Sequence, residues 1–159
     1  MSAQTPEDIR QFDRWFAVES NNLAWELSEL PKLSPANADK MLHAAHAAAF
    51  HWSRVGTELN LARADLLLGQ VYALLGNGAL AMKYAQPSFN YLTGIESPDW
   101  EVAFAHAVLA HAAYVAEDLP LYIEHHSIAS TLGEVIADPG DQEIFQRTFR
   151  RIPAPAAID

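Results

Sequence analysis

The chain contains no cysteine among its 159 residues, which excludes disulfides, thiolate metal sites and cysteine nucleophiles. Basic residues are few: ten Lys and Arg stand against twenty Asp and Glu, a formal net charge of −10. Such a charge repels phosphate groups, so we expect neither nucleic acid nor an anionic membrane surface as a partner. Long apolar runs and strand-type alternation are also lacking, so neither a membrane-spanning helix nor a sheet is expected.

The composition is that of a folded protein, because half of the residues are apolar and about a fifth are charged. The length suits one domain. We expect a single helical-repeat domain at 1–153 and a short C-terminal tail at 154–159. The polar first ten residues lack the apolar segment of a secretion signal, so a cytoplasmic location is the simplest expectation.

Helix boundaries are clearly marked. Ser, Thr or Asp followed by Pro marks helix starts, as at Thr5-Pro6 and Ser34-Pro35. The side chain caps a free backbone N–H, and Pro fits the first turn because it has no N–H that would lack a partner there. Gly or Pro marks ends, as at Gly56 and Gly76. We therefore predict an all-α protein of about seven helices, joined by short loops that make neighbours antiparallel. The predicted helices are 6–30, 35–55, 58–75, 78–93, 98–117, 119–137 and 141–151, with a kink near Lys83 caused by Pro87.

The segment 58–75 is apolar almost all round and should lie at the centre. Within it, Leu68, Gly69 and Tyr72, with Ala81 in the next helix, match four of the seven positions of the tetratricopeptide pattern. The chain resembles tetratricopeptide-repeat proteins in these residues. The block Phe50–Ala64 also resembles small uncharacterised bacterial helical-repeat proteins, for which no activity is implied.

This resemblance implies stacked antiparallel helix hairpins in a right-handed superhelix, and a bacterial origin. It further implies a groove, lined by the first helix of each hairpin, that binds a peptide or protein segment. A shift of 42 residues overlays 58–75 on 98–117 and places His111 on Gly69 and Ile123 on Ala81, which predicts a degenerate second repeat. An unrelated orthogonal helical bundle is the alternative fold.

Two surfaces are candidates for binding. The helical wheel groups Asn60, Arg63, Gln70 and Leu74 on one side, and the repeat register places the last three of these in the groove. Arg63 could clamp a carboxylate there or simply pair with an acid of the first helix. The second helix carries a candidate self-association patch for a homodimer, against the more ordinary interpretation of a solvated polar face with one surface aromatic. That patch comprises His43, His46, Phe50 and Arg54.

The histidines suggest a third possibility. His111 shares an apolar side with Trp100 and Phe104, so these residues either form a small ligand pocket or His111 is a satisfied core residue. His106 looks like solvated surface. No histidine spacing fits a metal site, so no metal ion, cofactor or catalytic group is expected.

These observations favour a non-enzymatic protein–protein or peptide interaction module that self-associates. A small-ligand-sensing domain is the alternative, and a His-dependent metal protein or enzyme ranks third.

Overall fold

The computed structural model describes residues 5–156 and is all-helical over that range. Its seven helices confirm the predicted all-α class, and most boundaries lie within about two residues of the predicted ones. The helices are α1 (Pro6–Ser28), α2 (Pro35–Val55), α3 (Glu58–Leu74), α4 (Gly78–Thr93), α5 (Asp99–Val115), α6 (Leu119–Glu134) and α7 (Pro139–Phe149). None of these helices is both long enough and apolar enough to cross a lipid bilayer.

Side chains cap most of the helix starts. Thr5, Ser34 and Thr57 each accept a hydrogen bond from a backbone N–H three residues on, which satisfies a donor that the helix leaves free. Helix α5 begins differently, because Pro98 stands at its cap and Ser97 instead donates to the carbonyl of Leu92. Helix α4 runs on through Pro87 as a single helix.

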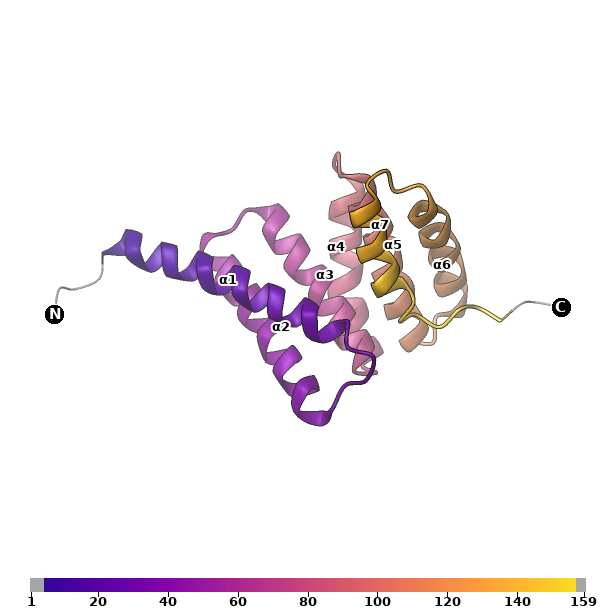
Figure 1. Cartoon of the computed structure of the whole chain (residues 1–159), viewed down its shortest axis with the longest axis horizontal. Coiled ribbons are helices and arrows are strands. Elements are labelled where there is room, and N and C mark those ends of the chain that lie inside the picture. Colours follow the sequence, from indigo (N-terminus) through magenta and orange to yellow (C-terminus); the bar gives the residue numbers. More distant parts are fainter. Residues whose placement is uncertain (1–4, 157–159) are drawn as a thin grey trace.

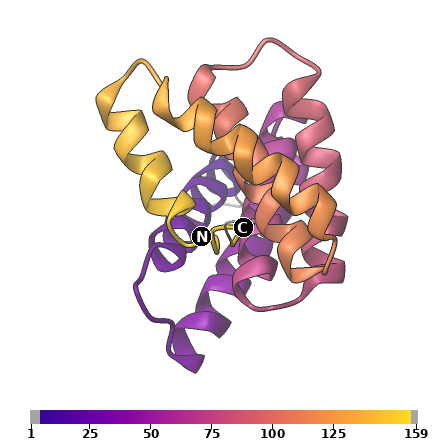
Figure 2. The same cartoon turned by 90° about the vertical axis from the view of Figure 1, so that its right-hand side faces the viewer.

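Consecutive helices form hairpins that lie in a row. Figure 1 shows α1 and α2 at one end, α3 and α4 in the middle, and α5 and α6 at the other end. Each helix packs against its neighbours in the chain, and α3 also touches α1 and α5. When the row is viewed from its α6 end, α7 lies to one side of α6, where it contacts both α5 and α6 (Figure 2).

Two apolar clusters hold the row together. The first includes Met41 of α2 and Leu67 of α3, with α1 contributing Ala24. The second joins α3 to α7 and includes Phe104 and Phe145. Because α3 contributes to both clusters, the structure confirms its predicted central position. Helix α5 is buried even more completely, with eleven buried residues against nine in α3.

Hairpins α3–α4 and α5–α6 repeat with an offset of 41 residues, not the predicted 42. Helix starts at Glu58 and Asp99 and helix ends at Leu74 and Val115 are 41 apart, and so are the bounds of α4 and α6. The correct equivalent of Gly69 is therefore Ala110, which keeps a small residue there. Ala81 corresponds to Tyr122 and not to Ile123. The degeneracy predicted at His111 resulted from a one-residue error in register.

The two hairpins also turn in the same way. The N–H of Asn77 donates to the carbonyl of Tyr72, and that of Asp118 donates to the carbonyl of Ala113. The residue just before each donor has a positive φ, 76° at Gly76 and 63° at Glu117. This geometry closes the end of a helix by satisfying its last carbonyls.

Candidate functional site

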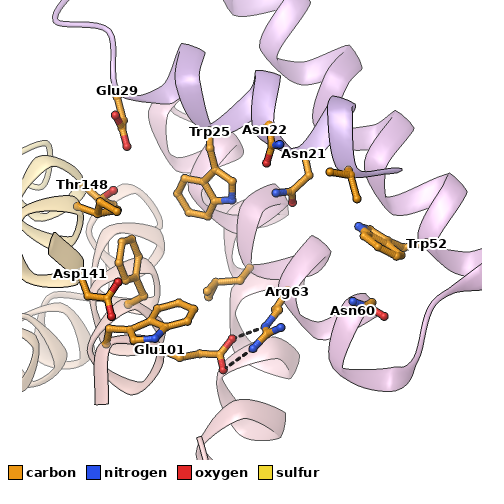
Figure 3. Close-up of a pocket in the computed structure, with 15 residues that line it drawn as sticks. Asn21, Asn22, Trp25, Glu29, Trp52, Asn60, Arg63, Glu101, Asp141 and Thr148 are labelled. Carbon is orange, nitrogen blue, oxygen red and sulfur yellow. Dashed lines mark hydrogen bonds and ion pairs between the residues drawn. The ribbon is translucent and has the colours of Figure 1, made fainter. Parts of the chain in front are cut away.

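A groove of about 520 Å³ lies along one side of the row of helices. Helices α1, α3, α5 and α7 line it, and Trp52 of α2 closes one end (Figure 3). The sequence predicted a groove floored by the first helix of each hairpin, and α1, α3 and α5 do line this one. Helix α7 was expected only as a terminal cap, yet it forms the remaining wall.

Arg63 lies in this groove and is held by Glu101 of α5. Its Nε donates to Oε1 at 2.5 Å and its Nη2 donates to Oε2 at 3.1 Å, a bidentate pair (Figure 3). Glu101 is only 2% exposed, and its carboxylate raises the pKa of Arg63. Arg63 does pair with an acid, but that acid belongs to α5 and not to the first helix. In the 41-residue register Glu101 is the counterpart of Asn60, which also lines the groove.

Gln70 does not reach the groove, which corrects its predicted place on the binding surface. It is 1% exposed and lies between α3 and α5, where its Oε1 is 3.3 Å from Nδ1 of His111. The two residues are 41 apart, so equivalent positions of the two hairpins meet each other. Leu74 is also outside the groove, because it packs against the cluster formed with α1 and α2. Of the four residues that the helical wheel grouped on α3, only Asn60 and Arg63, nearer its start, line the groove.

The structure places the three residues of the predicted ligand pocket, Trp100, Phe104 and His111, in two different environments. Trp100 and Phe104 line the groove. His111 is 5% exposed and lies in the core beside Gln70, where burial, and secondarily the charge of Arg151, lower its pKa to about 4. Its alternative reading as a satisfied core residue is therefore the one that the geometry supports, and the two predicted sites merge into one groove.

The four residues of the proposed α2 patch all lie exposed on one face. Phe50 is 59% exposed, and the guanidinium of Arg54 lies 5.8 Å from the centre of its ring. Arg54 also donates to Asp13 of α1 at 2.7 Å, and His46 lies 2.7 Å from the Tyr72 hydroxyl. His43 is exposed nearby. The structure brings these residues together as predicted, although two of them already have partners within the chain.

The neighbouring face of α1 adds apolar side chains that the sequence analysis did not single out. Five exposed residues, here called the aromatic surface, cover the first half of α1 and the adjoining part of α2. These are Ile9, Phe12, Trp15, Phe16 and Phe50, each 42–59% exposed. The ring of Phe16 stacks on His51 of α2 at 5.3 Å, so this surface is continuous between the two helices.

His106 is not the solvated surface residue that the sequence suggested. Its Nδ1 lies 2.8 Å from Nδ1 of His125 on α6, and Phe89 of α4 packs edge-on against both rings. Burial, with the nearby His125, lowers the pKa of His106 to about 4. One ring must donate and the other accept, so at least one of the two histidines is neutral, and burial lowers the pKa of both.

No group of three or more His, Asp or Glu side chains that could hold a metal ion occurs among residues 5–156. The acidic side chains of the groove, Glu29, Glu101 and Asp141, come from three different helices. Sequence reasoning missed Glu29 and Asp141, along with Trp25 and Thr148, because α7 follows α1 by more than a hundred residues and no local pattern links the two helices.

A scan against protein-family models and searches of curated proteins and of solved structures find no match to this chain. The site must therefore be interpreted from its own geometry.

Proposed function

We propose that this chain is a non-enzymatic, cytoplasmic, tetratricopeptide-like interaction module that binds a peptide or a partner's extended segment in the groove. The single observation that carries the proposal is the groove itself, which is open, about 520 Å³ in volume and lined by side chains from five helices. Its walls combine apolar rings with a few polar groups, as binding sites usually do.

The polar groups at one end suit a peptide backbone. Asn21, Asn22 and Asn60 line the groove near Arg63. The amides of Asn21 and Asn22 offer both donors and an acceptor, and that of Asn60 offers donors, because its Oδ1 accepts from Thr57 in the cap of α3. These groups match the alternating N–H and C=O groups of an extended chain. The Nη1 of Arg63 is not engaged by Glu101, so the guanidinium retains donors for a carbonyl or carboxylate of the ligand.

Selection of peptides from a random phage-displayed library tests this function. The selected peptide should bind the wild-type protein in a fluorescence-anisotropy titration. Asn21→Trp fills the groove and should weaken binding at least tenfold, whereas Asn90→Trp, on the exposed side of α4 outside the groove, should leave binding unchanged. Failure to select any peptide, or equal binding by both variants, would refute the proposal.

The aromatic surface favours a second role, and we propose that a second copy of this chain covers it. A two-fold contact must be self-complementary, so a charged group on the patch needs a group of opposite sign on the same patch. Glu19 follows Phe16 by three residues and Trp15 by four, which places its carboxylate on the same face of α1. Arg54 of α2 supplies the positive group.

Light scattering after gel filtration tests this self-association. The wild-type protein should be a dimer at about 100 µM, and Trp15→Ser combined with Phe50→Ser should be a monomer. Ile95→Ser removes an exposed apolar residue elsewhere, one that is 41% exposed, and should remain dimeric. A monomeric wild-type protein would exclude the dimer.

A further inference from the structure

One end of the groove combines aromatic rings with oxygen atoms. Trp25, Trp100 and Phe104 form its wall, with ring centres 5.9 Å apart for Trp25 and Phe104 and 6.2 Å apart for Trp100 and Phe104. Both pairs are close to perpendicular, at 80° and 84°. The wall therefore presents ring faces in more than one direction. Figure 3 shows Glu29, Asp141 and Thr148 on the same side of the groove as Trp25, and all of these residues line it.

The two carboxylates at this end are poorly compensated. Within residues 5–156, Asp141 makes no ion pair, and Glu29 has only a long contact of 3.7 Å with Arg147. The short contact of Arg147 is instead with Glu143, at 2.7 Å. The only guanidinium lining the groove is that of Arg63, which is already paired with Glu101. A net negative charge therefore remains at the aromatic end.

Thr148 gives a second, independent indication. Its side chain lines the groove and is 2% exposed, and its hydroxyl has no hydrogen-bond partner among the described residues. A buried polar group without a partner is costly, so a binding group that supplies one is favoured. A hydroxyl can accept a hydrogen bond from an N–H donor.

We propose that this end of the groove binds an organic cation, the guanidinium or ammonium of an Arg or Lys side chain in the bound peptide. Ring faces attract such cations, most strongly those of Trp, and nearby carboxylates add charge-assisted hydrogen bonds. The net charge of −10 attracts a basic ligand from a distance. This inference rests on the proposed peptide-binding function and specifies its ligand. A free organic amine has the same chemistry, so the test must separate the two sources.

The two ends of the groove then differ in what they recognise. The Trp25 end takes the basic side chain, and the Asn21 and Asn60 end, with Arg63, takes peptide backbone or a carboxylate. The ligand is accordingly bound in one direction, because reversal would place its cation beside Arg63.

Calorimetric titration with matched peptides tests the inference. A set of eight-residue peptides with a polyalanine background, two flanking leucines and one central residue carries Arg, Lys, citrulline or norleucine at the centre. The Arg and Lys peptides should bind at least tenfold more tightly than the citrulline and norleucine peptides. The fluorescence of Trp25 and Trp100 should change on binding of the basic peptides.

Substitution of the two carboxylates tests whether they bind the cation. Asp141→Asn and Glu29→Gln should each weaken the Arg peptide at least fivefold and leave the norleucine peptide unchanged. Glu134→Gln, an exposed carboxylate on α6, is the matched control and should change neither. Far-UV circular dichroism verifies that each variant is folded.

The outcomes separate this inference from the proposed function. Equal binding of the norleucine and Arg peptides overturns the cation site and leaves the peptide groove standing. Binding of N-acetylargininamide, with no added affinity for any peptide, supports the cation site and overturns the peptide function. Absence of binding by all of these probes overturns the cation site, and success of the phage selection would then still support a peptide groove.

Discussion

Hairpin α3–α4 has a hairpin on either side, whereas hairpin α5–α6 has a hairpin on one side and the short helix α7 beside it. Their helices begin, turn and end at positions 41 residues apart, yet several equivalent side chains differ in kind. Leu92 corresponds to Gly133, Asp65 to His106 and Gly76 to Glu117. The two hairpins thus share their backbone geometry at an offset of 41 residues. Their side chains differ at equivalent positions because the two hairpins pack against different neighbouring helices.

Gly133 shows this dependence most clearly. A Cβ built there would lie 2.1 Å from a ring carbon of Phe145, whose side chain is fully buried, whereas the equivalent Leu92 is itself a buried core residue. The glycine thus makes the space into which α7 docks.

Substitution at Gly133 should have the largest effect on stability. Gly133→Ala forces Phe145 out of its site and should cost about 3 kcal/mol, the upper end of the range for overpacking. Chemical denaturation measures this loss. Gly140→Ala in α7, where a Cβ would meet a single atom, the capping Oδ1 of Asp138 at 3.0 Å, should cost less, about 1 kcal/mol. Equal effects of the two variants would show that Gly133 is not the docking site of α7.

Loss of the ion pair between Arg63 of α3 and Glu101 of α5 should have the next largest effect on stability. Arg63→Met leaves the buried carboxylate of Glu101 without its partner and should cost about 2 kcal/mol, less than for a fully buried pair because Arg63 is partly exposed. The double variant Arg63→Met with Glu101→Met should recover most of that loss in equilibrium denaturation. A double variant as unstable as Arg63→Met alone would contradict this explanation.

Asp65 and His106 are equivalent positions and should respond to pH in opposite directions. Burial lowers the pKa of His106 to about 4 in the folded state, so the unfolded chain takes up its proton first as the pH falls below about 6.5. His106 therefore makes the protein less stable between about pH 6.5 and pH 4. Burial raises the pKa of Asp65, so its contribution to stability is present at acid pH and is lost as the pH rises through its folded pKa.

Stability measured by denaturation at several pH values tests this contrast. His106→Asn should reduce the loss between pH 6.5 and pH 4.5 by about 1 kcal/mol, without abolishing it, because the pKa of the buried His111 is also lowered. Asp65→Asn should leave that loss intact and slightly increase stability at pH 7. The same pH profile in both variants would refute the opposite signs.

Substitutions in the turns of the two hairpins should have the smallest effect on stability. Glu117 has a φ of 63°, a conformation that costs a non-glycine residue about 1 kcal/mol and costs glycine little. Glu117→Gly should therefore raise the melting temperature by a few degrees, and Gly76→Glu should lower it by a similar amount. A fall in melting temperature for Glu117→Gly would show that its side chain matters more than its backbone conformation.

The sequence was sufficient to predict the helices, because Thr5, Ser34 and Thr57 cap their starts by local hydrogen bonds, which depend on few other residues. It also placed Asn60, Arg63, Trp100 and Phe104 on faces that do line the groove. It could not show that Glu101 would pair with Arg63, or that Asp141 and Thr148 would complete the site. Those contacts join helices that are far apart in the chain, and local residue patterns in one sequence do not indicate which distant helices contact each other.

The 41-residue repeat also determines by what increment the groove can lengthen. Positions 58–98 contain one hairpin and the connection to the next, so a second copy of this segment would present its own counterparts of Asn60, Arg63 and Leu66 in line with those already there. The groove therefore grows in whole steps, by one hairpin at a time. A protein built in this way would accommodate a longer ligand by gaining a module, with each helix keeping its present length.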